Sequence, residues 1–246
     1  MIFDVDIGNT RIKWRLGDEV QDIIRAGTVN LDDLENLSVQ LSGSSAARIR
    51  AACVAGPAIE QRFTQWCERQ FGRVPEYARV RQGVGGIHVS YDSPADFGVD
   101  RWLAMLAAYQ QIKGACVVLD AGSAVTADFI DDDGSHLGGL ILPGARLMRE
   151  ALLAQTHGVK PGSLMLPQKW QPGRDTLSCV NNAVAAAFTG LVNEIMRYGE
   201  ASCGKNLRVL VCGGDAEALA CRDERLIIRA GLVLDGLPIA LGDHLS

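Results

Sequence analysis

The sequence lacks the features that mark membrane, secreted and nucleic-acid-binding proteins. No apolar run reaches about 18 residues, so no membrane span is expected. The first six residues include two acids and no basic cluster, which argues against a secretory signal peptide. Positive charge is not in excess either: 24 Lys and Arg stand against 29 Asp and Glu, for a net charge of −5. Because a nucleic-acid-binding face needs clustered Lys and Arg, we do not expect a nucleic acid as a partner. The lack of a long apolar run means that we do not expect a membrane as a partner either.

The spacing of metal-ligating residues is also missing. The seven cysteines are an odd number and form no CxxC pair, and the four histidines do not have the spacing of zinc ligands. We therefore expect reduced, mostly buried thiols in a cytoplasmic protein. The 246 residues, 48% hydrophobic and 22% charged, are enough for two globular domains of roughly 100–150 residues each.

The N-terminus combines a buried strand with an acidic glycine bend. Residues 2–5 form a short apolar run that leads into Asp6-Ile7-Gly8-Asn9-Thr10. Residues 11–16 then alternate polar and apolar side chains, which predicts a second, half-buried strand.

The same pattern returns in the second half of the chain. The apolar residues 116–119 lead into Asp120-Ala121-Gly122-Ser123, and residues 125–130 predict another strand. The spacing from Asp6 to Asp120 equals the spacing from Gly8 to Gly122. A repeat of such long period is typical of a duplicated unit.

The remaining elements fit a duplicated α/β layout. Residues 50–54 and 208–212 each predict a strand followed by a glycine turn and a helix, while residues 102–112 and 181–198 predict long helices. Alternating strands and helices favour layered α/β domains. We place the boundary near Gly114, with an N-terminal domain 1–114 that carries the first bend and a C-terminal domain 115–246 that carries the second.

The two bends have the chemistry of a phosphate site. A glycine lets the backbone approach a bulky anion, and a turn exposes N–H groups that bind phosphate oxygens. A neighbouring carboxylate can hold a cation that bridges to the phosphate. A single Asp-Gly bend is also compatible with a hairpin that binds nothing. Two bends at matched positions favour nucleotide phosphates.

Three other segments allow two interpretations each. Asp100, in Gly98-Val99-Asp100-Arg101, is either an acid in the first turn of a helix or a general base beside an anion-binding Arg101. The turn at residues 213–215 is either a nucleotide contact or a tight connection in which Asp215 caps a helix. Asp4 and Asp6 either resemble the paired aspartates of haloacid-dehalogenase-type phosphatases, with Asp4 as the nucleophile, or belong to the first bend. The bend is favoured, because Gly8 stands where the phosphatase motif has Thr or Val and a phosphatase has no use for a second bend.

The ordered set of motifs resembles the type III pantothenate kinases over nearly the whole length. It comprises the Asp6–Thr10 bend, Gly98-Val99-Asp100-Arg101, Asp120-Ala121-Gly122-Ser123-Ala124-Val125-Thr126, His136-Leu137-Gly138-Gly139 and Pro143-Gly144. The resemblance implies two duplicated actin-like (ribonuclease H-like) domains, each a mixed sheet flanked by helices, with an interdomain cleft. It also implies ATP-dependent phosphorylation of pantothenate to 4′-phosphopantothenate, the first step of coenzyme A biosynthesis.

The resemblance assigns a role to individual residues. Asp100 is implied as the catalytic proton acceptor, and Asp120 as the ligand of a monovalent cation, K⁺ or NH₄⁺. Ser123 stands where the family more often has Thr and keeps the hydroxyl, and Asp175-Thr176 stands where the family has Asn-Thr. The implied ATP-binding residues are Asp6, Ile7, Gly8, Asn9, Thr10, Arg11, Ile12, Lys13 and Ser123. The implied pantothenate-binding residues are Tyr91, Gly98, Val99, Asp100, Arg101 and Thr176.

The same resemblance implies a cytoplasmic homodimer that receives Mg²⁺ with its ATP. Two alternatives stay open. One is a sugar or acetate-type kinase of the same superfold, although the chain is short for most of these. The other is a nucleotide-sensing regulator without turnover, against which the presence of Asp100 argues, because a pure binding protein needs no base.

Overall fold

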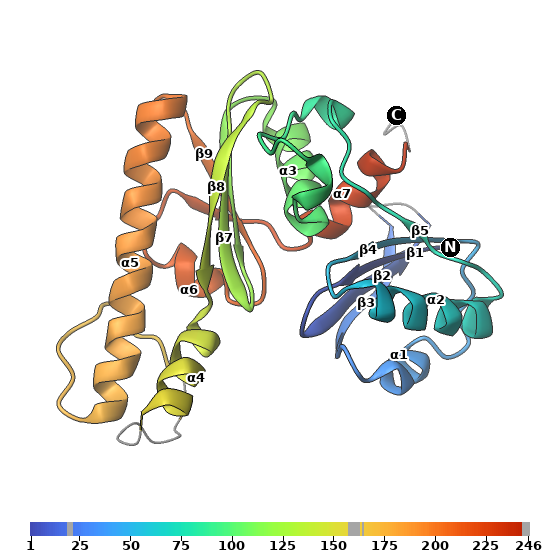
Figure 1. The fold of residues 1–246 in the computed structure, drawn as a ribbon, viewed down its shortest axis with the longest axis horizontal. Helices are drawn as coiled ribbons and strands as arrows, with labels where there is room; N and C mark the ends of the chain where they lie inside the picture. The colour runs from blue at the N-terminus through green and yellow to red at the C-terminus, as the bar shows by residue number, and fades with distance from the viewer. Residues whose placement is uncertain (19–21, 157–162, 164, 243–246) are drawn as a thin grey trace. The chain divides into compact units, whose positions relative to one another are not determined.

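The computed structural model describes residues 1–18, 22–156, 163 and 165–242, and the chain forms two compact units (Figure 1). Unit 1 consists of Met1–Gln111 together with the segment that begins at Gly231, and unit 2 of Ile112–Ala230. Each unit contains a five-stranded mixed sheet.

The sheet of unit 1 has the strand order β3-β2-β1-β4-β5. Strands β1, β2 and β3 pair antiparallel, whereas β4 lies parallel to β1 and β5 parallel to β4. The strands are β1 (Ile2–Ile7), β2 (Arg11–Gly17), β3 (Ile23–Asn30), β4 (Arg48–Cys53) and β5 (Glu76–Tyr77). Side chains alternate between the two faces, so Phe3, Val5 and Ile7 share one face of β1, and Asp4 and Asp6 share the other.

Two helices cover the apolar face of this sheet. Helices α1 (Leu34–Gln40) and α2 (Pro57–Phe71) lie together on one side of it in Figure 1. Phe63 and Trp66 of α2 pack in one buried cluster with Phe3. A proline at the first helical position and the left-handed Gly72 after the last one set the limits of α2.

Helix α7 (Leu232–Ala240) covers the other face of the sheet, where it contacts β1 and β4. It also packs closely on α3 (Val99–Ile112), because a methyl group at Gly236 would overlap the carbonyl oxygen of Leu103. The C-terminal helix therefore belongs to unit 1, whereas the sequence analysis assigned all of 115–246 to the second domain. The physical reason is that the apolar α7 buries its surface against β1, β4 and α3, which all precede Gly114.

Unit 2 repeats the topology of unit 1. Its strand order is β10-β9-β6-β7-β8, in which β6, β7 and β8 pair antiparallel while β9 and β10 follow in parallel. The strands are β6 (Cys116–Ala121), β7 (Ala124–Ile130), β8 (His136–Pro143), β9 (Arg208–Cys212) and β10 (Leu226–Ile228). Equating β6 with β1 matches every strand of one sheet with a strand of the other. The predicted duplication of a mixed α/β domain is confirmed.

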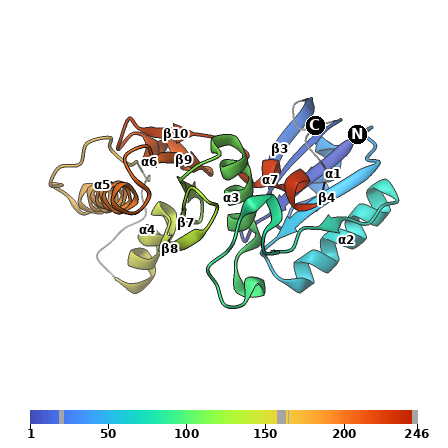
Figure 2. The same ribbon diagram turned by 90° about the horizontal axis from the view of Figure 1, so that it is seen from above.

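Three helices complete unit 2. They are α4 (Ala145–Gln155), α5 (Thr176–Cys203) and α6 (Ala216–Ala220). Buried side chains recur along α5 at helical spacing, at Val184, Phe188, Val192 and Ile195, and pack on the sheet. Figure 2 shows α5 end-on, with α6 beside it. Among the described residues, no helix has the length and apolar character that a membrane crossing requires.

Candidate active site

The first predicted bend is a tight β-hairpin between β1 and β2. The N–H of Gly8 donates to the carbonyl of Arg11 at 3.0 Å, which closes the turn around Asn9 and Thr10. Asn9, Thr10 and Arg11 are exposed, whereas Ile7 and Ile12 are buried in the core of unit 1. Ile7 and Ile12 can therefore reach a ligand only through their backbone atoms.

Asp6 and Lys13 lie opposite each other across this hairpin. They are register partners on β1 and β2, and Lys13 Nζ lies 4.0 Å from Asp6 Oδ2. Asp6 is 7% exposed, while the Lys13 side chain is 39% exposed. A buried acid thus sits next to a lysine that extends toward solvent at the end of the sheet.

Asp4 cannot be a phosphatase nucleophile. It is 2% exposed, and its carboxylate accepts hydrogen bonds from Arg15 Nε at 2.9 Å and from Arg50 Nε at 2.6 Å. A nucleophile has to reach its substrate, and this carboxylate is enclosed by two guanidinium groups. The interpretation of Asp4 and Asp6 as a phosphatase pair is therefore wrong.

The second predicted bend is a matching hairpin between β6 and β7. The N–H of Gly122 donates to the carbonyl of Ala124 at 2.9 Å, as Gly8 does to Arg11 in unit 1. Asp120 occupies the position of Asp6, and its register partner on β7 is Thr126. The two hairpins thus present an acid at the same place in the same topology.

Two glycine turns of unit 2 pack directly on the second hairpin. A methyl group at Gly213 would overlap the Ala121 carbonyl and the Asp120 carboxylate, and Gly213 has a φ of +95°. A methyl group at Gly144 would overlap the carbonyls of Gly122 and Ser123. Both positions require glycine for steric reasons. The β8–α4 and β9–α6 turns consequently hold the hairpin from two sides.

Oxygen atoms converge beside Gly213. The backbone of this glycine packs against both Asp120 Oδ1 and the Ala121 carbonyl oxygen, which brings these two oxygens close to each other. A carboxylate with main-chain carbonyls is a donor set that suits a hard cation. Asp215, which follows in the turn, donates its N–H to Ala121 at 2.9 Å, but its side chain makes no capping hydrogen bond to α6.

Among the described residues, the acidic group with metal-ligand spacing is elsewhere in unit 2. It is Asp131, Asp132 and Asp133, in the β7–β8 turn at the other end of β7. Asp131 and Asp133 accept backbone N–H groups at 2.8 Å within that turn. These bonds explain the acidic run as local turn structure.

All the predicted pantothenate residues except Thr176 lie at the start of α3 or in the segment before it. Asp100 lies in the first turn, where Asp100 Oδ1 accepts the N–H of Arg101 at 2.8 Å. A Cβ at Gly98 would lie 2.8 Å from the same oxygen. Arg101 Nη1 is 3.4 Å from the Tyr91 hydroxyl, and the guanidinium stacks 4.4 Å above the ring of Phe97.

Phe97 is a member of this group that the sequence analysis missed. It is 3% exposed and makes an edge-on contact with the Tyr91 ring at 4.9 Å. Phe97 therefore contacts both Tyr91 and Arg101. Its position directly before Gly98 was the sequence signal that could have included it in the site. Val99 is buried, whereas Tyr91 is 38% exposed and Asp100 is half-buried.

Thr176 lies in unit 2, as the first residue of α5. The preceding Asp175 forms a capping box: its carboxylate accepts the Ser178 N–H at 2.9 Å, and Ser178 Oγ accepts the Asp175 N–H at 3.2 Å. Hydrogen bonding to Ser178 keeps the pKa of Asp175 below its usual value. The Asp that replaces the family's Asn is thus explained as a helix cap, and Thr176 is exposed beside it.

A hollow of about 520 Å³ lies at the β4–α2 turn of unit 1. Cys53, Pro57, Thr64 and Arg79 are among the residues that line it. None of the predicted site residues lines it, but the adjacent Val54 donates its N–H to Ile7 at 3.0 Å. The hollow is therefore next to the first hairpin. Because it is open and its lining is partly charged, it is a weaker candidate for the pantothenate site than the residues around Asp100.

Comparison with known proteins identifies the family. The model of the type III pantothenate kinases matches residues 2–198. The chain belongs to this family. It is 39% identical to a type III pantothenate kinase of Teredinibacter turnerae over 95% of this chain and 98% of that protein. It is 35% identical to one of Pseudomonas fluorescens over 98% of each.

Solved structures show the same fold at lower sequence identity. A Campylobacter jejuni protein, named as a Baf family transcriptional activator, has a TM-score of 0.66 at 20% identity and covers 97% of this chain and 96% of its own. The ethanolamine utilization protein EutJ of Carboxydothermus hydrogenoformans has a TM-score of 0.55 at 13% identity, and the match covers 97% of this chain and 88% of EutJ. These similarities agree with the actin-like fold that the family has.

Proposed function

We propose that this protein transfers phosphate from ATP to pantothenate, producing 4′-phosphopantothenate in the first step of coenzyme A biosynthesis. The observation that carries the proposal is the group at the start of α3, where the half-buried carboxylate of Asp100 adjoins Arg101, which contacts the Tyr91 hydroxyl and the Phe97 ring. A base for the acceptor hydroxyl and a cation for the pantothenate carboxylate are what this reaction requires.

The first hairpin is proposed to bind the ATP phosphates. Phosphoryl transfer places negative charge on the transferred group, and catalysis consists mainly of positioning the phosphates and offsetting that charge. The exposed turn from Gly8 to Arg11 offers backbone N–H groups, and Lys13 adds a positive charge. Ser123, in the second hairpin, is proposed to contact the nucleotide through its hydroxyl. Mg²⁺ would arrive with ATP.

Asp100 is proposed to remove the proton from the pantothenate hydroxyl as the oxygen attacks the γ-phosphate. Its carboxylate lies in the first turn of α3, beside Arg101. Gly98 and Val99 shape the turn beside it, and Arg101 with Tyr91 would orient the substrate. Thr176 is proposed to add a hydroxyl contact to pantothenate.

Asp120 and the Ala121 carbonyl are proposed to hold a monovalent cation, K⁺ or NH₄⁺. The closeness of the Asp120 carboxylate and the Ala121 carbonyl oxygen beside Gly213 supports this assignment. When bound, such a cation supplies positive charge next to the phosphates. Asp120 fixes its place, and the Gly213 and Gly144 turns hold the hairpin that carries Asp120.

The protein is proposed to act as a homodimer through unit 2. Several exposed apolar side chains lie on the consecutive elements β8 and α4. They are Leu137, Leu140, Ile141, Leu147 and Leu152. Covering such a surface gains hydrophobic free energy. Light scattering should give a dimer mass, and Ile141→Asp should shift it toward the monomer; a wild-type monomer would contradict the proposal.

The state of the cysteines is compatible with the proposed place in the reducing cytoplasm. None of the seven forms a disulfide bond in the structure. Burial raises the pKa of the Cys116 thiol to about 12 and also raises that of Cys67, so both stay protonated and unreactive at neutral pH.

A panel of phosphate acceptors tests the proposed function. ADP release from ATP would be followed with pantothenate, glucose or acetate as acceptor, each with and without K⁺. We expect release with pantothenate only, and faster release in K⁺ than in Na⁺. Release with a sugar or acetate would favour the other kinases of this superfold, and ATP binding without release would favour a regulator.

A further inference from the structure

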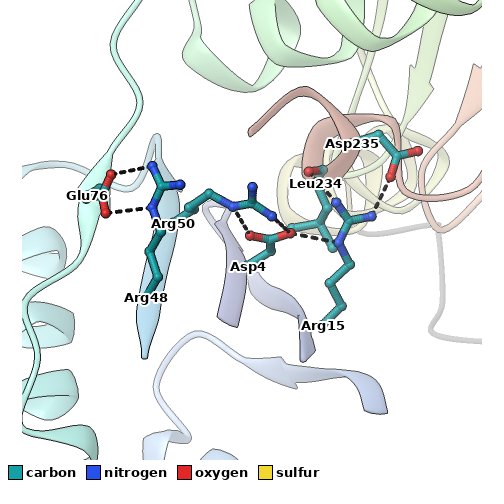
Figure 3. Close-up of polar contacts among 7 residues, drawn as sticks. All are labelled: Asp4, Arg15, Arg48, Arg50, Glu76, Leu234 and Asp235. Atoms are coloured by element: carbon teal, nitrogen blue, oxygen red, sulfur yellow. Dashed lines mark hydrogen bonds and ion pairs between the residues drawn. The ribbon is translucent and has the colours of Figure 1, made fainter. Parts of the chain in front are cut away.

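A buried cluster of charged side chains lies two residues along β1 and β2 from the Asp6–Lys13 pair of the proposed phosphate hairpin. Asp4 and Asp6 share one face of β1, and their register partners Arg15 and Lys13 share the same face of β2. The outer pair, Asp6 and Lys13, belongs to the hairpin that is proposed to bind the ATP phosphates. The inner pair, Asp4 and Arg15, is 2% and 6% exposed and lies under helix α7. Figure 3 shows this inner pair.

Arg15 binds Asp4 on the neighbouring strand and joins the hairpin to α7 through two further contacts. Its Nε donates to Asp4 Oδ2 at 2.9 Å, its Nη2 donates to the Leu234 carbonyl at 2.7 Å, and its Nη1 pairs with Asp235 (Figure 3). Arg50 binds the other side of Asp4, through Nε at 2.6 Å and Nη2 at 2.9 Å. Two carboxylates and two guanidinium groups therefore balance in charge within this cluster.

Pro238 explains why the Leu234 carbonyl is available to Arg15. In an α-helix the carbonyl of residue 234 would accept the N–H of residue 238, but proline has no N–H. Arg15 satisfies the oxygen that this proline leaves without a helical partner. The sequence of α7 thus creates an acceptor at the point where Arg15 reaches it.

The far end of α7 is attached to the segment that leads toward Tyr91. Arg81 Nη2 donates to the carbonyl of Ala240, and a Cβ at Gly85 would lie 3.0 Å from the Ile239 side chain. Gln82 then bonds both the N–H and the carbonyl of Val89, at 2.9 and 3.0 Å. Helix α7 consequently contacts both the hairpin strands and the segment that leads toward Tyr91.

We infer that Asp235 is a positioning residue for ATP, acting through Arg15 on the β1–β2 hairpin. The inference rests on the proposed function of that hairpin. Asp235 draws the Arg15 guanidinium toward α7 while Asp4 holds its other edge, so β2 is fixed at Arg15, two residues from Lys13. Without Asp235 the guanidinium loses one anchor, and the hairpin that carries Asp6 and Lys13 becomes more mobile.

The test uses Asp235→Asn, a mild substitution because the Asp235 side chain is 26% exposed and the Leu234 contact remains. We expect the KM for ATP to rise about fivefold, the size of an ordinary coupling between two sites. The KM for pantothenate should stay unchanged. Amide hydrogen exchange without nucleotide should become faster in residues 3–16.

Glu76→Gln is the matched control. Glu76 forms a two-pronged ion pair with Arg48, at 2.8 and 2.7 Å, between β4 and β5 of the same sheet (Figure 3). The Glu76→Gln substitution weakens an ion pair between β4 and β5 and alters no residue of β1, β2 or α7, so exchange at residues 3–16 and both KM values should match the wild type.

A second variant keeps the charge of Asp235. Pro238→Ala restores an N–H that competes with Arg15 for the Leu234 carbonyl, and it should also raise the KM for ATP selectively. Unchanged exchange at residues 3–16 in Asp235→Asn would overturn the inference, and so would faster exchange with an unchanged KM for ATP. Failure of the wild type to bind ATP would instead refute the proposed function, while the exchange comparison would still decide whether Asp235 orders the hairpin.

Discussion

Replacing Asp100 with asparagine is expected to lower kcat by about 10²–10⁴-fold, the usual contribution of a general base. Asparagine has the same shape and its amide oxygen can still accept the Arg101 N–H, so the first turn of α3 should persist. It cannot take a proton from the acceptor hydroxyl. The measurement is ADP release at saturating ATP and pantothenate, with ATP affinity determined separately by calorimetry.

Asp96→Asn provides the control for this variant. Asp96 ends the short turn Pro94–Asp96 in the same segment, and it is exposed. Its replacement removes one negative charge near α3 without removing the base. If Asp100→Asn retained near-normal turnover, or if Asp96→Asn lost as much, Asp100 would not be the proton acceptor.

Gly213→Ala is expected to have the largest effect on stability. The added methyl group would overlap the Ala121 carbonyl and the Asp120 carboxylate, and alanine is disfavoured at a φ of +95°. Left-handed backbone strain and overpacking each cost about 1–3 kcal/mol, so a loss of roughly 3 kcal/mol in the free energy of unfolding is predicted. Activity should fall as well, because the Asp120 carboxylate has to move.

The neighbouring glycine gives a direct comparison. A Cβ at Gly214 meets no atom within 4 Å, and Gly214 has no positive φ. Gly214→Ala should therefore change the free energy of unfolding by no more than about 0.5 kcal/mol. Chemical denaturation of both variants measures the difference; equal stability would mean that the β9–α6 turn does not pack on the second hairpin as described.

The two hairpins could be predicted from the sequence because their signals are local. Each consists of an apolar strand, an acid, a glycine and an alternating strand within a short stretch of chain. Their duplication was visible because Asp120 and Gly122 repeat the spacing of Asp6 and Gly8. The roles proposed around Asp100 came from the resemblance to the type III pantothenate kinases, because the local pattern from Gly98 to Arg101 is equally compatible with an acid in the first turn of a helix.

Features that depend on distant segments could not be predicted in this way. Helix α7 is apolar on most sides, so its sequence does not reveal whether it packs on β1 and β4 of unit 1 or on unit 2. The contact between Gly213 and Asp120 joins two strands that are far apart along the chain. The partners of Asp4 became evident only when the register of three strands was known.

The most direct measurement of the central claim is the identity of the phosphorylated product. The purified protein would be incubated with ATP, Mg²⁺, K⁺ and pantothenate, and the product examined by mass spectrometry and ³¹P NMR. We predict a phosphate monoester on the 4′-hydroxyl of pantothenate, formed at the same rate as ADP. ADP formed without phosphopantothenate, or phosphate found on any other group, would contradict the account.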